Sequence, residues 1–267
     1  MFDILLPASR TGDLLRRTLS AVSSSTCHPS RVVLVLDGAV MSETERRWLA
    51  ALPFEVLVIE QPRKGITAAL KAGEAVLRHA FFARLDIGDL VAPDRFARQI
   101  AFLESQPGVV GVGVRSRLVF PSTGSPRERL SFAATDGEIA RQLPLRNVFV
   151  HGSLMLRTEA VRRVGGYDTK FFTSQDYDLL LRLSRVGRLS IIADVLHSHY
   201  FHSDGSTLTR PRTQLVMSLK AKWRHVKRGY VPSFKFVLYV VRDALLVLLP
   251  SRVSASLKSR SRNNRGE

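Results

Sequence analysis

Apolar and polar residues follow two patterns along the first half of this chain. Short runs rich in β-branched and aromatic residues, each ending in a polar or turn-forming residue, predict strands. Between them apolar residues recur at helical spacing, as at Leu15, Leu19 and Val22. Strands that alternate with helices are typical of a βαβ sheet. The predicted strands cover residues 2–6, 31–36, 55–59, 81–85 and 109–114.

The middle of the chain adds two helices and one irregular segment. Apolar spacing predicts a helix over 66–77, and another begins at Pro93, where Phe96 and Ile100 share one face. Residues 121–145 are richer in Pro, Ser, Thr, Gly and charge. We therefore expect a long excursion over the sheet there, and such segments often act as lids or binding loops.

Length and composition indicate a cytoplasmic globular protein. A chain of 267 residues with 45% hydrophobic residues suits one large domain with a helical appendage. Cys27 is the only cysteine, so no disulfide can form within the chain and a reducing compartment is expected. Residues 1–7 form a short apolar run that Asp3 interrupts, with no basic region before it, and do not resemble a secretory signal.

The net charge of +17 is concentrated toward the C-terminal end. From Arg210 onward there are fourteen Lys and Arg residues but only Asp243 and Glu267 as acids, which places about +12 there. Such a tail implies an anionic partner, either phospholipid or nucleic acid. It lacks the pattern of an RNA-recognition motif or a zinc finger, so we do not expect nucleic acid. Residues 254–267 are almost entirely Ser, Arg, Lys and Asn and are expected to be disordered.

An amphipathic segment precedes that tail. An apolar stripe at helical spacing runs from Phe234 to Leu249, and Arg242 and Asp243 interrupt it. The segment is too short and too charged for the roughly 20 apolar residues of a spanning helix. The stripe could pack on the main domain or lie in a membrane interface, because its pattern alone does not separate the two. The flanking basic residues favour an anionic surface, the inner face of the cell membrane.

Acidic residues come directly after predicted strands. Asp37 and Asp86 each end one, and ligands of open α/β sheets bind in the crevice outside the carboxyl ends of the strands. Asp86 and Asp89 also crowd into one short turn, where a hard divalent cation would relieve their repulsion. The alternative is a polar turn that only caps the next helix.

Acidic and histidine side chains farther along offer more chemistry. Asp176 lies in the first turn of a predicted helix, where it could be a general base or could simply complement the helix N-terminus. His197 and His199 fall on one face of a predicted extended stretch and His202 on the other, so a three-histidine metal site is not expected. A single histidine could still join a cation at the 86–89 turn.

The order of these motifs resembles that of the family 2 glycosyltransferases, which have the GT-A fold. The most specific match is Ala-Arg-Leu-Asp-Ile-Gly-Asp-Leu at 83–90, which resembles the acidic DXD-type element of the family. Residues 4–7, 33–38 and 63–70 resemble the first strand with its proline, the second strand with its terminal acid, and the segment beside the nucleotide base. Residues 151–157, 164–168 and 175–179 are similar to the acceptor-side blocks, so the resemblance covers about residues 2–207.

The resemblance implies an α/β fold, a GT-A type Rossmann-like mixed sheet flanked by helices, with a helical basic tail. The expected boundaries are a catalytic domain over 1–207, an amphipathic helical region over 208–253 and a disordered tail over 254–267. The implied enzyme is an inverting hexosyltransferase. It would move a sugar from a nucleotide-sugar donor, expected to be UDP-linked, to a hydroxyl of a glycan or lipid-linked acceptor in cell-surface polysaccharide synthesis.

The resemblance also implies roles for single residues. Asp176 matches the catalytic base of the family, which takes the acceptor proton as the hydroxyl attacks the anomeric carbon. A Mg²⁺ or Mn²⁺ ion at Asp86, Asp89 and His202 would neutralise the leaving diphosphate. The residues expected to contact the substrates are Pro7, Asp37, Arg63, Lys64, Asp86, His151 and Gln175.

Two departures from the family pattern support a second hypothesis. Gly88 stands where the family usually has an acid at the third position of DXD. Ala8, Ser9 and Arg10 replace the usual aromatic residue and Asn after the proline. The competing hypothesis is a catalytically weak or inactive relative that binds a nucleotide sugar or a membrane partner.

Overall fold

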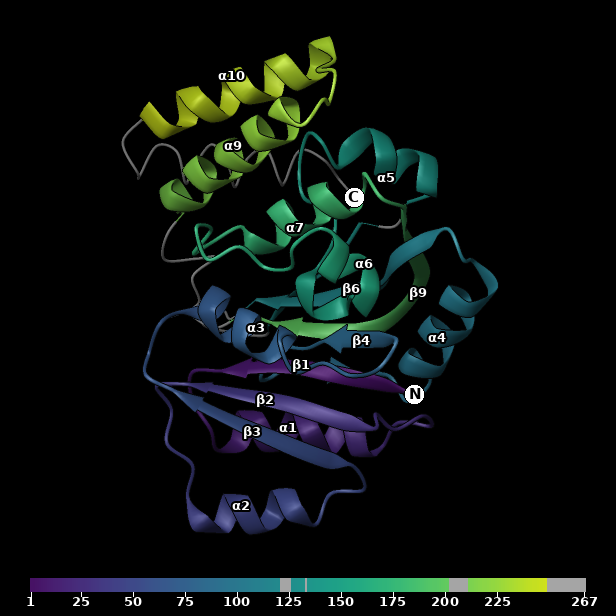
Figure 1. Ribbon diagram of the computed structural model, residues 1–267, viewed down its shortest axis with the longest axis vertical. Coiled ribbons are helices and arrows are strands. Elements are labelled where there is room, and N and C mark those ends of the chain that lie inside the picture. Colours follow the sequence, from purple (N-terminus) through teal and green to yellow (C-terminus); the bar gives the residue numbers. More distant parts are fainter. Residues whose placement is uncertain (121–125, 133, 202–210, 249–267) are drawn as a thin grey trace.

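A mixed β-sheet runs through the protein, with helices on both of its faces (Figure 1). The computed structural model describes residues 1–120, 126–132, 134–201 and 211–248. Within these residues nine strands form one sheet in the order β3-β2-β1-β4-β8-β6-β9-β5, and β7 pairs with β6 off this path. The predicted α/β class, a mixed sheet flanked by helices, is confirmed.

The N-terminal half is a parallel βαβ sheet, as the sequence predicts. β1 pairs with β2 on one side and with β4 on the other, and β2 pairs with β3, all in parallel. Alternate residues of β1 enter different core clusters, with Leu5 in one and Ile4 and Leu6 in the other. Both faces are therefore buried, which explains why these strands are nearly continuous apolar runs. The elements are β1 (Phe2–Ala8), α1 (Asp13–Ser23), β2 (Arg31–Asp37), α2 (Glu43–Ala50), β3 (Glu55–Gln61), α3 (Ile66–Glu74) and β4 (Phe81–Arg84).

The second half adds antiparallel pairs and a long curved strand. β8 is antiparallel to both β4 and β6, whereas β9 runs parallel to β6 and antiparallel to β5. The elements are β5 (Leu90–Val91), α4 (Arg95–Ser105), β6 (Val109–Phe120), β7 (Arg127–Leu130), α5 (Asp136–Gln142), the 3-10 helix η1 (His151–Ser153), β8 (Met155–Arg157), α6 (Thr158–Arg163), α7 (Gln175–Leu183) and β9 (Arg188–Tyr200).

The predicted irregular excursion over 121–145 needs correction. Its described part contains β7, which pairs with β6, and α5, which a capping box between Thr135 and Glu138 begins. The abundance of polar and turn-forming residues hid both short elements from the sequence pattern.

The helices α9 (Pro211–Lys227) and α10 (Phe234–Leu248) form a hairpin above the sheet domain (Figure 1). They are joined by a buried ion pair between Lys222 and Asp243, whose Nζ and Oδ2 atoms lie 2.6 Å apart. Phe236 is also buried, and it contacts the Tyr230 ring. No helix among the described residues combines the length and apolar character needed to cross a membrane. The tail predicted over 254–267 lies outside the described residues.

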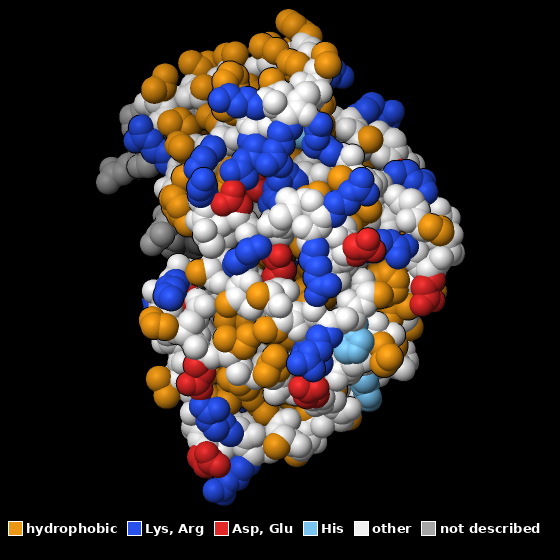
Figure 2. All heavy atoms as spheres, viewed as in Figure 1, with side chains coloured by type: hydrophobic (Ala, Val, Ile, Leu, Met, Phe, Trp, Pro, Cys, Tyr) orange, Lys and Arg blue, Asp and Glu red, His pale blue; other side chains and the backbone are white. Residues whose placement is uncertain are grey.

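The predicted apolar stripe of α10 faces away from the rest of the protein. Figure 2 shows hydrophobic side chains along the top edge of the molecule, over α10, and a band of Lys and Arg below it. The alternative in which the stripe packs on the main domain is therefore wrong for the described residues. The exposed members are Phe234, Val237, Leu238, Val241, Leu245 and Leu248.

Candidate active site

The turn at residues 86–89 follows β4 and is held by α1. Asp86 is partly exposed, and its Oδ1 atom accepts a hydrogen bond from the buried guanidinium of Arg84 at 2.5 Å. Gly88 has a φ of 90°, a conformation that favours glycine. Its amide donates to Thr18 Oγ1 at 2.8 Å, and Thr18 donates to the Asp89 carbonyl at 3.0 Å. The glycine at the third position of the acidic motif therefore suits the backbone geometry of this turn.

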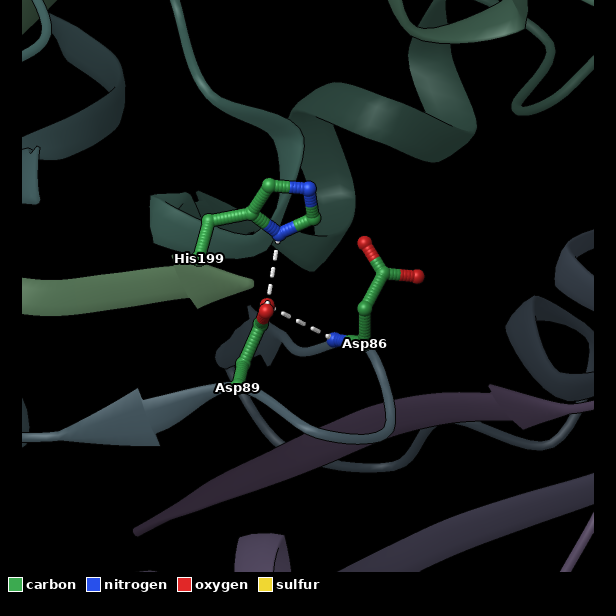
Figure 3. A group of neighbouring side chains, drawn as sticks. All are labelled: Asp86, Asp89 and His199. Carbon is green, nitrogen blue, oxygen red and sulfur yellow. Dashed lines mark hydrogen bonds and ion pairs between the residues drawn. The ribbon is translucent and has the colours of Figure 1, made fainter. Parts of the chain in front are cut away.

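Asp89, the last residue of this turn, is buried and ties the turn to β9 (Figure 3). Its Oδ2 atom accepts a hydrogen bond from the Asp86 amide at 3.2 Å and lies 3.0 Å from Nε2 of His197. Its Oδ1 atom lies 2.8 Å from Nδ1 of His199. Burial alone would raise the pKa of Asp89, but the charges and hydrogen bonds of the two histidines outweigh burial and lower it. Asp89 is thus an ionised anchor for both histidines.

Asp86, Asp89 and His199 could hold a divalent cation. Within the described residues they are the group of His, Cys, Asp or Glu whose ligand atoms all lie within 4.8 Å of one another. Carboxylate oxygens suit Mg²⁺ and Mn²⁺, and imidazole suits transition metals, so the donor set fits. His197 orients Asp89 from behind and itself contacts Ser116 Oγ at 2.9 Å, as outer-shell partners of metal ligands do. The predicted ligand His202 lies outside the described residues.

Asp176 lies in the first turn of α7, after a residue in an uncommon conformation. Ser174 has a φ of 56°, which is rare for a residue with a Cβ atom, and its hydroxyl donates to the Gln214 carbonyl of α9 at 3.2 Å. The Asn147 side-chain amide donates to Asp176 Oδ2 at 2.7 Å. Burial raises the pKa of Asp176 above its ordinary value. A raised carboxylate pKa suits a general base that works near neutral pH.

A cavity of about 1240 Å³ brings the two acidic regions together. It extends from the 86–89 turn to α9 and α10, and its wall includes His199. Four of the predicted site residues line it: Asp86, His151, Gln175 and Asp176. Five others, all within the described residues, do not line it: Pro7, Asp37, Arg63, Lys64 and Asp89.

The predicted donor-side segment has a defined structure beside the end of β2. Both carboxylate oxygens of Asp37 accept backbone hydrogen bonds, from the Lys64 amide at 2.7 Å and the Gly65 amide at 2.8 Å. Asp37 is buried, whereas Arg63 and Lys64 are exposed. Asp37 therefore fixes the backbone of the segment, and the two basic side chains lie on its surface.

Helix α9 is anchored next to the candidate base. Arg224 contacts Asp168 Oδ2 at 2.7 Å and Asp178 Oδ1 at 3.1 Å. Asp178, two residues after Asp176, also pairs with Arg182 at 2.8 Å. These contacts are buried or half-buried, so α9 holds the start of α7 in place.

Comparisons with known proteins identify the family. The sequence profile described as Glycosyltransferase like family 2 matches residues 2–226. The chain belongs to this family. It is 30% identical over 272 residues to the amylovoran biosynthesis glycosyltransferase AmsE of Erwinia amylovora, with 98% of this chain and 99% of that protein covered. It is 23% identical over 251 residues to the UDP-Gal:alpha-D-GlcNAc-diphosphoundecaprenol beta-1,3-galactosyltransferase of Escherichia coli, with 89% and 86% covered.

Solved structures share the fold of this glycosyltransferase. The mannosyltransferase PcManGT from Pyrobaculum calidifontis, in complex with GDP-Man and Mn²⁺, matches all of the chain with a TM-score of 0.66 and 15% identity, over 80% of its own chain. S. aureus TarS 1-349 in complex with UDP-GlcNAc matches 91% of the chain with a TM-score of 0.65 and 12% identity, over 71% of its own chain. These likenesses support the predicted GT-A fold.

Three side chains of this glycosyltransferase site were assigned no role from the sequence. Arg84 is a fully buried charge within an otherwise apolar strand, and such a charge signals a buried partner because unpaired buried charges are rare. His199 had a weaker signal, its place on one face with His197. Asn147 had none, since its contact with Asp176 joins segments 29 residues apart.

Proposed function

We propose that this glycosyltransferase is an inverting enzyme that moves a sugar from a uridine nucleotide donor to a hydroxyl of a glycan or lipid-linked acceptor in cell-surface polysaccharide synthesis. The proposal rests on one observation: Asp176, a carboxylate with a raised pKa, lines the same cavity as Asp86 of the acidic motif. The relatives add support, because one is an amylovoran biosynthesis enzyme and another uses UDP-Gal and a diphosphoundecaprenol-linked acceptor.

Asp176 is assigned as the general base. The Asn147 amide holds its Oδ2 atom and so fixes the carboxylate, and Oδ1 is the atom that we assign to proton transfer. It would take the proton of the acceptor hydroxyl while that oxygen attacks the anomeric carbon. The nucleoside diphosphate leaves from the opposite face, so a single displacement inverts the configuration at that carbon.

The donor lies at the 86–89 turn in this proposal. A bound Mg²⁺ or Mn²⁺ ion supplies charge that stabilises the leaving diphosphate. Asp86, Asp89 and His199 are the residues that would hold it, and Arg84 orients the Asp86 carboxylate. The role of His202 stays a prediction. For the substrates we propose contacts with Pro7, Asp37, Arg63, Lys64, Asp86, His151 and Gln175.

Replacing the base tests the reaction. Asp176→Asn keeps the shape of the side chain and removes the base, so transfer should fall by about 10²- to 10⁴-fold while donor binding stays near the parent value. Asp136→Asn is the matched control, because Asp136 is also in the first turn of a helix but does not line the cavity. Transfer by Asp176→Asn at the parent rate would leave Asp176 as no more than a helix-start acid.

Gly88 favours a second candidate, a relative that binds the donor without transferring the sugar. The turn geometry shows how glycine fits there, but it does not restore the carboxylate that the family usually places at this position. Hydrolysis of UDP-sugars with added Mn²⁺ separates the candidates. An active enzyme releases UDP slowly without acceptor, whereas a binding protein releases none although it retains the nucleotide sugar.

The surface of α10 supports a place at the cytoplasmic face of the cell membrane. Of the fourteen exposed large hydrophobic residues described, nine lie on α9, α10 and the turn between them. Trp223 on α9 is 62% exposed, and tryptophan is common at membrane interfaces. Lys227, Arg228 and Lys235 are exposed beside this surface. An apolar helical face flanked by basic residues fits an interfacial helix on anionic lipid.

Sedimentation with vesicles tests this placement. The whole chain should bind anionic vesicles at low salt, and the double variant Leu238→Glu/Leu245→Glu should lose most of that binding. Val40→Glu is the control, because Val40 is 88% exposed but lies far along the chain from α10. A soluble whole chain that ignores anionic vesicles at low salt would exclude the membrane placement.

A further inference from the structure

Two arginines converge on one short segment of the cavity wall. Arg115 of β6 donates from Nε to the Ser131 carbonyl at 3.3 Å. Arg146, which follows α5, holds its guanidinium carbon 5.1 Å from the centre of the Phe132 ring. Ser131 and Phe132 are consecutive, and both arginines line the cavity and are half-buried. Their guanidinium groups therefore approach the same part of the wall.

Among the described residues no carboxylate pairs with either of these two arginines. Arg146 donates from Nε to the side-chain oxygen of Gln142 at 3.0 Å, and the partner of Arg115 is a carbonyl. Among the described residues neither forms an ion pair, whereas the cavity residues Arg84 and Lys222 pair with Asp86 and Asp243. Counting the described residues, seven basic side chains and four carboxylates line the cavity, so the charge of this lining is positive. An anionic ligand fits this wall.

One arginine of the pair lies next to the residue that holds the base. Arg146 directly precedes Asn147, whose amide holds Asp176, and consecutive Cα atoms are about 3.8 Å apart. An anion held by the pair therefore belongs to the molecule that presents a hydroxyl to Asp176. That molecule is the acceptor.

An apolar wall continues from the arginine pair. Leu118, Phe120 and Leu130 line the same cavity, and the Phe120 ring stacks on Phe201 with the ring centres 4.4 Å apart. The pairing of β6 with β9 shifts register on both sides of Arg115, and the extra residues of this irregularity lie on β9.

We propose that Arg115 and Arg146 bind the diphosphate of a lipid-linked acceptor, with the acceptor sugar toward Asp176 and the hydrocarbon along Leu118 and Phe120. This inference rests on the proposed function, because it takes Asp176 to mark the acceptor hydroxyl. A guanidinium fork matches phosphate oxygens in two parallel hydrogen bonds, and two forks suit a diphosphate. The cavity thus offers a base, two cations and an apolar wall for the sugar, diphosphate and lipid of such an acceptor.

Binding of acceptor fragments without a sugar tests the subsite. The probes are farnesyl diphosphate, farnesyl phosphate and farnesol, titrated calorimetrically into the whole chain with saturating UDP and Mn²⁺ present. The diphosphate should bind most tightly, and Arg115→Gln and Arg146→Gln should each weaken it by about 10- to 100-fold, the range for a hydrogen bond to a charged group. Farnesol binding should not change in either variant.

The control variant is Arg117→Gln. Arg117 lies on the same strand, but it is exposed, pairs with Glu128 and does not line the cavity, so its loss should leave all three affinities unchanged. Arg115→Lys and Arg146→Lys retain the charge and should recover part of the affinity, which separates loss of charge from loss of fold.

Three results would overturn the inference: equal affinity for the diphosphate and farnesol, parent affinity in both glutamine variants, or binding of a lipid-free uronic acid oligosaccharide by a protein that does not bind farnesyl diphosphate. Each can occur while the enzyme still binds nucleotide and still needs Asp176 for transfer. Failure of the proposed function would instead appear as no nucleotide binding or as full activity of Asp176→Asn.

Discussion

Gly152 packs directly against the buried Asp89 carboxylate of the active site, and Gly152→Ala should disrupt this packing. A Cβ atom at this position would lie 2.3 Å from Oδ2 of Asp89 and 3.1 Å from Nε2 of His197. Since Cβ contacts under 3.0 Å essentially do not occur, the carboxylate would have to move by about 0.7 Å. The 3.0 Å contact with His197 and the 3.2 Å bond from the Asp86 amide leave little room for that shift.

The cost follows from the burial of Asp89. Hydrogen bonds to charged groups contribute about 1.5–3 kcal/mol each, and a buried carboxylate that loses one is not rescued by water. Losing one or two should lower the free energy of unfolding by roughly 2–5 kcal/mol. Because Asp89 also joins the proposed cation site, Mn²⁺-dependent nucleotide binding should weaken as well.

Urea denaturation and nucleotide titration with and without Mn²⁺ measure the two effects. Gly137→Ala is the matched control: Gly137 lies in α5, where a new Cβ meets nothing closer than 3.8 Å, so this change should stabilise the protein slightly. A Gly152→Ala protein as stable as the parent, with unchanged nucleotide binding, would refute the claim that a side chain at position 152 displaces Asp89.

Three further predictions concern the side chains of Asp86, Lys222 and His225. Asp86→Ala should weaken nucleotide binding with Mn²⁺ but change it little in chelator, and equal parent affinity in both conditions would contradict a cation there. Lys222→Met should lower the unfolding free energy by roughly 1–3 kcal/mol, because it removes a charged hydrogen bond to the buried Asp243 while Asp243 keeps its pair with Arg242, and adding Asp243→Leu should restore most of it in urea denaturation. Burial lowers the pKa of His225 to about 4, so its neutral form stabilises the fold above about pH 6.5 and that contribution is lost as the pH falls toward 4. His225→Gln should flatten the pH dependence of stability across this window by roughly 1–3 kcal/mol, and an unchanged slope would exclude His225 as its source.

The correctly predicted parts of the fold are those that a pattern of neighbouring residues in the sequence marks. β1 and β2 are buried at every position, so a nearly continuous apolar run marks each of them. Asp37 and Asp86 were found because a polar residue directly after such a run marks the end of a strand. The order of motifs then led to the family, because the series of weak signals is far more specific than any one of them.

The parts that were missed depend on distant contacts. The hydrogen bond between Asn147 and Asp176 and the pairing of Asp89 with His199 join residues 29 and 110 positions apart. No periodicity records such a contact, because it exists only once the sheet has formed. β7 was missed for a related reason: it is largely exposed and pairs only at one edge, so burial imposes no apolar pattern on it.

Helix α9 connects the candidate base to the exposed face of α10. Arg224 and Lys222 are two residues apart, about 200° around a helix, so they leave α9 on opposite sides. Arg224 reaches Asp178 beside the base, and Lys222 reaches Asp243 on α10. Both contacts are ion pairs with at least one buried partner, and breaking the Lys222–Asp243 pair would leave the buried Lys222 charge unpaired, so the three helices should move as one unit. A surface that binds α10 would then hold the cavity at a fixed height above it. In the proposed membrane setting, the wall formed by Arg115 and Arg146 would meet the diphosphate of a lipid acceptor without lifting its hydrocarbon far from the bilayer.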